Sequence, residues 1–428
     1  MYAWHRINFT IIVQHKYSIK ITKFEILLLL FPIDFVHQLL HKMYPNLHFI
    51  FKKLLGWDAP VFFSVIQTYG LFLAITFVIG GIIIYHELKR KYNEGLLTDV
   101  CVDINPKSDM IINGVMGFLF GFKLLGIALN YSKFIEDPQG FVFSAEGSLA
   151  GGVVLAAIMS GAKYLEIRKH QLVRKTILKK PQDLIGDMVV IAAIFGLIGS
   201  KILAIVEPSA WQGFLQDPIG TFFSGEGIAI YGGLLGGFIS LYIYSKRKGI
   251  NPLHLMDAGA PALILGYGTG RLGCHFSGDG DWGIVNLAAK PFGWLPDWAW
   301  SYTYPNNVIK RGIPIENCNG TFYTDEYCNV LPEGVYPTSV YETLIMVVLF
   351  LIFWAFRKRI KVWGIMFSMY LIVNGIERFT IETIRVNHRY DWFFNLSQAQ
   401  MVALGFILTG LTTGLIFWQQ HQKRTVNT

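Results

Sequence analysis

The strongest constraint in this sequence is a series of mostly apolar windows, each about 20 residues long. A helix of about 20 apolar residues spans the roughly 30 Å of hydrocarbon in a bilayer. Only 15% of the 428 residues are charged, against roughly 25% in soluble domains. We therefore expect an all-α, polytopic integral membrane protein with about nine transmembrane helices, at residues 60–85, 111–131, 147–165, 186–206, 227–246, 252–274, 337–357, 362–384 and 398–418.

The charges of the connecting loops predict how the chain is oriented. Basic residues gather in alternate connections, such as 89–91, 163–180 and 246–248, whereas the loop at 207–226 is acidic and has no Lys or Arg. Because basic loops stay in the cytoplasm, we predict that the N-terminus lies outside and the C-terminus inside. The formal charge of +8 is then explained by topology, and no nucleic-acid partner is expected.

Residues 1–42 do not fit this order. They are basic although they would lie outside, and their apolar stretch is short and contains Pro32 and Asp34. We interpret them as a dubious extension, a translated upstream stretch, with the working protein starting near Met43. A signal peptide is the alternative, although no small-residue cleavage site follows. Residues 43–428 are expected to form a single transmembrane domain.

The longest polar segment, the external loop region 275–335, contains Cys318 and Cys328. Two cysteines on the outer side of a membrane are expected to form a disulfide. Two free thiols are the alternative. Cys101 lies in a cytoplasmic connection and is expected to stay reduced. Four cysteines in a chain of this length exclude a secreted disulfide scaffold.

A loop motif recurs at a constant separation of 80 residues. Asp137-Pro138-Gln139-Gly140 and the following Phe143–Gly147 return as Asp217-Pro218-Ile219-Gly220 and Phe223–Gly227. We interpret residues 111–165 and 186–246 as a direct repeat of a helix pair. The second pair has Tyr231-Gly232-Gly233 where the first has Ala150-Gly151-Gly152. If one copy is functional, we expect it to be the second.

Ionisable residues inside membrane spans are costly, so each of them is a candidate for function. Arg271 lies in the glycine-rich segment 270–283, where a guanidinium and accessible backbone N–H groups suit a phosphate. The alternative is an arginine that reaches to the interface from a helix end. Asp279 and Asp281 form a pair of the kind that binds divalent cations. Since no third acidic ligand follows at a fixed spacing, we predict no metal site.

A second charged group occupies the span at 362–384. Glu377, Arg378 and Glu382 lie within it and Arg385 follows. Arg378 and Glu382 are four residues apart and therefore share one helix face. A purely structural ion-pair network is the alternative.

The predicted topology brings four polar positions into the outer half of the bilayer. They include Tyr69, about nine residues or roughly 14 Å from the outer end of its span at 1.5 Å per residue. The others are Arg271, Arg378 and Tyr231. This arrangement favours a site for a lipid phosphate over an ion pathway, which also needs ionisable groups in the inner half.

From about Met43 to the C-terminus, the motifs resemble those of the prolipoprotein diacylglyceryl transferases. The matching segments are, in order, Thr68-Tyr69-Gly70, Tyr231-Gly232-Gly233-Leu234, Gly270-Arg271-Leu272-Gly273, Tyr336–Glu342, Arg378-Phe379…Glu382…Arg385 and Ser397-x-x-Gln400. The resemblance implies a multi-pass enzyme of the bacterial cytoplasmic (inner) membrane. It implies transfer of the diacylglyceryl group of phosphatidylglycerol to the lipobox cysteine thiol of a prolipoprotein. The products are a thioether and glycerol phosphate, and no cofactor is needed.

The resemblance also implies roles for individual residues. Catalytic roles fall on Arg271, Arg378, Glu382 and Tyr231, and substrate-binding roles fall on Tyr69, Gly232, Gly233, His275, Asp279, Gly283 and Arg385.

The sequence departs from the family pattern at three residues and by an insertion, after which the acidic residue of the signature corresponds to Asp279 or Asp281. Tyr231 replaces the family's histidine, and a tyrosine with a pKa near 10 is a poor base. Cys274 replaces an asparagine, and Asn374 a tyrosine. The helix pair at 111–165 is an addition. The general base is therefore open: Glu382, Asp279 and His275 are candidates, and positive potential alone is the alternative.

Two other functions compete with the transferase reading. The repeat keeps a membrane transporter or lipid flippase possible, and the changes at Tyr231 and Cys274 keep a non-catalytic lipid-binding homologue possible. Incubation with phosphatidylglycerol and a lipobox peptide separates them, because only an enzyme produces a diacylglyceryl mass shift.

Overall fold

The computed structural model of the protein describes residues 42–426, except 61–62, 65, 137–140, 142–143, 145, 171–173, 207, 224–228, 317, 319–326, 388 and 392–393. Most of the predicted extension 1–42 and parts of both repeated loop motifs lie outside the described residues. The long helices are α4 (Thr68–Asn93), α5 (Pro106–Leu129), α8 (Leu149–Lys169), α9 (Ile185–Val206), α12 (Ile230–Arg247), α13 (Pro252–Ser277), α15 (Thr338–Phe356), α16 (Ile365–Ile381) and α17 (Gln398–Val426).

Short elements connect these helices. They are α3 (Leu47–Ile50), a π-helix at Phe51–Leu55, α6 (Tyr131–Glu136), a 3-10 turn at Pro181–Leu184, α10 (Pro208–Gln216), α11 (Pro218–Phe223), α14 (Asp297–Trp300) and a 3-10 turn at Glu382–Ile384. In the described part of the chain, three small antiparallel ribbons pair β1 (Val100–Ile104) with β2 (Lys175–Lys179), β3 (Ile313–Pro314) with β4 (Asn329–Val330), and β5 (Arg389–Tyr390) with β6 (Leu396–Ser397).

A helix lies over each of the nine apolar windows, and the fold is that of a polytopic membrane protein. Among the described residues, six helical segments are long and apolar enough to cross a membrane: 68–93, 106–129, 149–169, 181–206, 338–356 and 398–423. Charged and polar residues interrupt the apolar character of α13 and α16, which carry Arg271 and Arg378. The number of crossings and the orientation of the termini remain predictions.

Polar side chains at the helix ends explain where α13 and α16 begin. The Asn251 side chain accepts the backbone N–H of Leu253, and Pro252 takes the first helical position, where its missing N–H costs nothing. The carboxylate of Asp257, on α13, accepts the backbone N–H groups of Gly364 (2.8 Å) and Phe367 (3.1 Å). Asp257 therefore caps α16 from a neighbouring helix.

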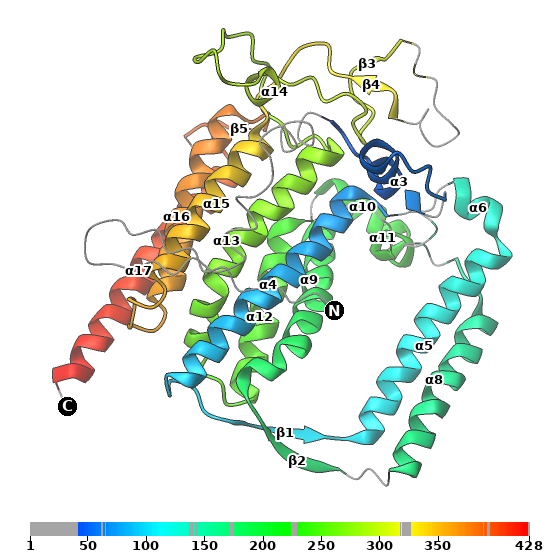
Figure 1. Ribbon diagram of the computed structural model, residues 1–428, viewed down its shortest axis with the longest axis vertical. Helices are drawn as coiled ribbons and strands as arrows, with labels where there is room; N and C mark the ends of the chain where they lie inside the picture. The colour runs from blue at the N-terminus through cyan, green and yellow to red at the C-terminus, as the bar shows by residue number, and fades with distance from the viewer. Residues whose placement is uncertain are drawn as a thin grey trace, which may run out of the picture.

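The core of the bundle lies between α4, α13, α15 and α16. Its fully buried side chains include Ile264 and Met346. On these helices the two charged clusters described below lie toward the ends, so the apolar middle separates them. In Figure 1 the bundle stands with the α14, β3 and β4 region at one end and the C-terminus toward the other.

The two repeated helix pairs have the same close packing. A Cβ at Gly121 of α5 would lie 2.2 Å from the carbonyl oxygen of Gly151 of α8, and a Cβ at Gly199 of α9 would lie 2.3 Å from that of Gly232 of α12. Such approach of two helix backbones requires glycine. Figure 1 shows α5 and α8 standing beside the bundle, with β1 and β2 leading to them.

The region after α13 forms a cap rich in aromatic residues over one end of the bundle. Its buried side chains include Trp282, Trp298, Tyr302 and Tyr304, with Met43 from the N-terminal side. Cys318 and Cys328 form a disulfide with a Cα–Cα distance of 5.9 Å, which confirms the predicted pairing. Cys101 is a free, exposed thiol.

Two predicted boundaries were wrong. The span at 60–85 begins only at Thr68, because the backbone of Gln67 pairs with Asn46 and the Thr68 N–H donates to the Pro45 carbonyl. Tyr69 is therefore in the first helical turn, not nine residues inside. The loop predicted from 275 begins after Ser277, where Gly278 ends α13 with a φ of 64°.

Candidate functional site

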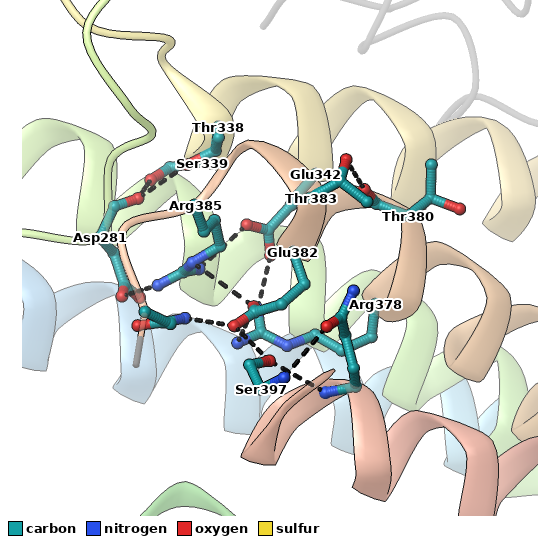
Figure 2. A network of polar contacts seen from close by, with 12 residues as sticks. Asp281, Thr338, Ser339, Glu342, Arg378, Thr380, Glu382, Thr383, Arg385 and Ser397 are labelled. Atoms are coloured by element: carbon teal, nitrogen blue, oxygen red, sulfur yellow. Dashed lines mark hydrogen bonds and ion pairs between the residues drawn. The ribbon is translucent and has the colours of Figure 1, made fainter. Parts of the chain in front are cut away.

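Three arginines and three carboxylates form one ion-pair network at the end of the bundle beneath the aromatic cap. Arg271 comes from the last turns of α13 and Arg378 from the last turn of α16. Arg385 follows the turn at Glu382–Ile384. Figure 2 shows Arg378 and Arg385 converging with Asp281, Glu342 and Glu382. The residues that the sequence places in two separate charged groups therefore meet in one site.

Arg271 is held on three sides. Its guanidinium pairs with the carboxylate of Asp281, its Nε lies 2.7 Å from Glu342 Oε2, and its plane lies over the Tyr267 ring with 5.1 Å to the centroid. The residue is only 6% exposed. A guanidinium buried this deeply is fixed in position before any ligand binds, which is what electrostatic catalysis requires.

Glu342 is the centre of the network, and the sequence reasoning did not place it among the site residues. It is fully buried, at the first turns of α15. Its oxygens lie 3.3 Å from Arg385 Nη1 and 3.8 Å from Arg378 Nη1, and the Tyr267 hydroxyl donates to it. The signal was present, because Glu342 is a carboxylate inside an apolar window, where an ionisable residue is costly.

The second carboxylate, Glu382, orients two arginines. Its Oε2 lies 3.2 Å from Arg378 Nη2 and 3.9 Å from Arg385 Nε, and its Oε1 accepts a hydrogen bond from the Ser397 hydroxyl at 2.8 Å. Two buried donors have no hydrogen-bond partner among the described residues, Arg378 Nη1 and Arg385 Nε. Carboxylate oxygens lie 3.8 Å from Arg378 Nη1 and 3.9 Å from Arg385 Nε, so each donor is in an ion pair but makes no hydrogen bond among the described residues.

Asp281 connects the network to the cap. Its carboxylate pairs with Arg271 and Arg385, and its carbonyl accepts the hydroxyls of Thr338 (3.0 Å) and Ser339 (2.9 Å). Burial raises the pKa of Asp281, but Arg271 and Arg385 outweigh it and lower the pKa to about 2. Asp281 is therefore ionised at neutral pH.

Asp279 has the opposite environment. Burial, and then the negative charge of Asp281, raise its pKa above the usual range. One oxygen of Asp279, one of Asp281 and the Cys274 sulfur lie within 4.8 Å of one another. The structure thus supplies a third donor that the sequence reasoning did not consider. Arg271 and Arg385 on Asp281 oppose a cation there, so the set fits a metal poorly.

Tyr231 and Tyr69 lie at the border of the network. Tyr231, in the first turn of α12, is half-buried and is an electrostatic neighbour of Arg378. Tyr69 is 37% exposed and is an electrostatic neighbour of Cys274, Asp279 and Arg271. The site therefore has two phenol groups near its arginines.

The predicted glycines have packing roles in the structure. A Cβ at Gly232 would clash with the Gly199 carbonyl at 2.2 Å, and one at Gly233 would lie 2.5 Å from Ser200 Oγ. Gly283 pairs with Arg385 through an isolated β-bridge, and a Cβ there would lie 2.7 Å from the Ile384 carbonyl. These glycines let helices and loops approach closely around the site.

His275 lies apart from the arginines. Its side chain is fully buried beneath the cap, with its Nδ1 3.4 Å from the Tyr304 hydroxyl and its ring 5.7 Å from that of Tyr302. These neighbours give His275 a place in the aromatic packing, whereas Arg385 pairs within the network and Asp279 accepts the backbone N–H of Asp281 at 3.2 Å.

Comparison with known proteins identifies the family. The sequence profile of the prolipoprotein diacylglyceryl transferases matches residues 151–417. The phosphatidylglycerol–prolipoprotein diacylglyceryl transferase of Dehalococcoides mccartyi (strain ATCC BAA-2266 / KCTC 15142 / 195) is 28% identical over 253 residues, 58% of this chain and 83% of that protein. Those of Staphylococcus haemolyticus (strain JCSC1435) and Staphylococcus aureus (strain MSSA476) are 32% and 30% identical, over 64% and 67% of this chain and 86% and 90% of their own lengths. The chain therefore belongs to the prolipoprotein diacylglyceryl transferase family.

Proposed function

We propose that this protein transfers the diacylglyceryl group of phosphatidylglycerol to the lipobox cysteine thiol of prolipoproteins in the bacterial cytoplasmic membrane. The relatives at 28–32% identity carry the name phosphatidylglycerol–prolipoprotein diacylglyceryl transferase. The family profile matches residues 151–417, a range that includes Arg271, Glu342 and Arg378. The multi-pass helical fold suits a substrate that resides in the bilayer.

The observation that carries the proposal is a pair of arginine donors in the network that make no hydrogen bond among the described residues. Arg378 Nη1 and Arg385 Nε are buried without a hydrogen-bond partner among the described residues. A buried guanidinium N–H without a partner is costly, and a phosphate oxygen supplies the acceptor that each lacks. We therefore place the phosphate of phosphatidylglycerol against Arg378 and Arg385, with Arg271 beside it.

The proposed reaction depends on the stabilisation of a negatively charged leaving group by the arginines. The thiolate of the acceptor cysteine attacks the glycerol carbon that carries the phosphate ester. A carbon–sulfur bond forms, the carbon–oxygen bond breaks, and its electron pair leaves with glycerol phosphate. Negative charge grows on the departing phosphate, and arginines fixed in a buried site stabilise that charge in the transition state. Before the attack, the proton of the thiol passes to a basic group of the site or to water, so that the charges balance.

The residues around the arginines have supporting roles in this scheme. Glu342 and Glu382 hold the guanidiniums in place through the contacts given above. We assign the hydroxyl of Tyr231, an electrostatic neighbour of Arg378, to the lipid headgroup, and Tyr69 is an electrostatic neighbour of Cys274 and Asp279. Tyr231 is thus assigned to headgroup binding and not to proton transfer.

A transfer assay separates the proposal from its rivals. The purified protein is incubated with phosphatidylglycerol and a lipobox peptide, and the peptide is examined by mass spectrometry for the added diacylglyceryl group. A transporter or flippase moves lipid between leaflets of a vesicle without modifying the peptide. A lipid-binding homologue binds phosphatidylglycerol and also leaves the peptide unmodified.

The first variant to test is Arg271→Ala. Loss of a preorganised cation should lower the transfer rate by about 10²–10³-fold, while the protein remains inserted in the membrane. Arg357→Ala is the matched control, since Arg357 is also paired with a buried glutamate, Glu87, but at the other end of the bundle. Transfer at the normal rate by Arg271→Ala contradicts the phosphate site.

A further inference from the structure

One carboxylate of the site lies outside the ion-pair network. Glu377 precedes Arg378 on α16 and is 6% exposed. Neither of its oxygens has a hydrogen-bond partner among the described residues. By contrast, Asp281 and Glu342 each pair with Arg271 and Arg385, and Glu382 accepts from Ser397 and pairs with Arg378.

The surroundings of Glu377 explain why its carboxylate stays free. It contributes to the wall of an apolar groove of about 310 Å³ between α15 and α16, lined also by Ile345, Leu349, Val373, Ile376, Thr380 and Ile381. The Thr380 hydroxyl is already engaged, because it donates to the Ile376 carbonyl at 2.8 Å. Yet Glu377 remains close enough to Arg271, Arg378 and Arg385 to interact with them electrostatically.

The acceptor thiol needs a group that takes its proton. A free cysteine has a pKa near 8.5, so at neutral pH most of the thiol is protonated. The carboxylates of Asp281, Glu342 and Glu382 already interact with arginines. Asp279 already accepts the backbone N–H of Asp281 and lies against the Cys274 sulfur, and His275 is buried among aromatic rings. An unpartnered carboxylate beside the phosphate-binding arginines meets the requirement.

We infer that Glu377 is the proton acceptor for the lipobox thiol, an inference that rests on the proposed transferase function. The S–H bond breaks as the proton passes to a Glu377 oxygen, and the sulfur keeps the electron pair with which it attacks the glycerol carbon. The leaving phosphate takes the electron pair of the carbon–oxygen bond. It gains one negative charge as Glu377 loses one, so the total charge of the site does not change. The proton then leaves with the phosphate, whose second pKa is about 6, or to water.

The experiment compares two acceptor peptides that differ in one atom. Glu377→Gln is assayed with a lipobox peptide and with the same peptide carrying selenocysteine, whose selenol is ionised at neutral pH and needs no base. With the cysteine peptide, kcat is expected to fall by about 10²–10⁴-fold, the usual contribution of general acid–base catalysis. With the selenocysteine peptide, most of that loss should disappear. The cysteine rate of the variant should also rise with pH toward the thiol pKa near 8.5.

Control variants distinguish loss of the proton acceptor from other causes of a slow reaction. Arg271→Ala should stay slow with both peptides, because it affects the phosphate and not the thiol. Thr380→Val, in the same groove, should keep the wild-type rate. If Glu377→Gln is not inserted, Glu377→Asp replaces it, and its shorter carboxylate should slow only the cysteine reaction.

Two results overturn the inference. One is a wild-type rate in Glu377→Gln, and the other is an equal loss with both peptides. Absence of transfer by the unmodified protein would instead contradict the proposed function itself.

Discussion

At the scale of single residues, buried glutamates organise the arginines at both ends of the bundle. Glu342 lies between Arg271 and Arg385 at the cap end, and Glu87 lies between Arg90 and Arg357 at the opposite end, with 2.8 Å from its oxygens to each. Both glutamates are nearly or fully buried. Their environments are alike, but only the first is next to the proposed phosphate site.

This pair gives a matched comparison between Glu342→Gln and Glu87→Gln. Breaking a buried ion pair by removing one partner costs about 3–5 kcal/mol, so both variants should unfold at lower temperature in detergent. Only Glu342→Gln should also lose transfer activity, by at least about 10²-fold, because Arg271 and Arg385 then lose their positions. Thermal unfolding and the peptide mass-shift assay measure the two effects separately. Equal activity in the two variants would contradict the role of Glu342.

Part of this site was predictable because charge is rare in apolar windows. Arg271, Arg378 and Glu382 attracted attention for that reason, and the structure brings them together. Which carboxylate meets which arginine was not predictable, since the pairs come from different helices and their spacing in the sequence says nothing about distance. Glu342 shows the limit of prediction from sequence. Its role depends on three arginines that belong to α13, to α16 and to the segment after the turn that follows α16.

At the scale of elements, apolar content located the helices well and their ends poorly. The nine windows coincide with nine helices, but α4 starts eight residues later than its window, at Thr68. Hydropathy gives no information about the backbone hydrogen bonds that determine where a helix begins. At α4 the relevant contact is the pairing of Gln67 with Asn46. Because the helix was predicted to begin too early, Tyr69 was predicted deep in the membrane, whereas it lies in the first turn of α4. Caps such as Asn251 before Pro252 give a better signal, because they supply the acceptor that a first turn needs.

The added helix pair is expected to be separable from the proposed site. α5 packs chiefly on α8, and its Lys123 donates to the carbonyls of Phe141, Ser144 and Glu146, which closes the loop of the pair internally. Ile104 of β1 faces Lys175 of β2 across the ribbon. A chain in which residues 105–174 are replaced by an Asn-Gly turn, the usual two-residue hairpin connection, should still insert.

The mass-shift assay tests that shortened chain. Its transfer rate should stay close to that of the full chain, because Arg271, Arg378 and Arg385 all lie on other elements. The control carries the same Asn-Gly replacement but between α9 and α12, in place of residues 208–228. It should lose activity, since Tyr231, in the first turn of α12, is an electrostatic neighbour of Arg378. Loss of activity in the first deletion would show that the added pair takes part in transfer.

At the scale of the whole molecule, the distribution of charge ties the site to one side of the membrane. The arginine network and the aromatic cap share one end of the bundle, and Lys91, Asp257, Glu87 and Arg357 gather toward the other. The basic connections that predict a cytoplasmic side include 89–91 and 357–359, next to the second cluster. The proposed site is then on the outer side.

Thiol labelling in intact cells tests this orientation. Cys101 is exposed on β1 and should react with a membrane-impermeant maleimide only after the membrane is opened, because it lies on the predicted cytoplasmic side. A new thiol from Trp294→Cys, at a side chain that is 77% exposed in the cap region, should react in unopened cells. Both measurements use the background Cys318→Ser with Cys328→Ser, which removes the disulfide thiols, while Cys274 is buried. Labelling of Cys101 in intact cells, with protection at position 294, would reverse the orientation and place the arginine network on the cytoplasmic side.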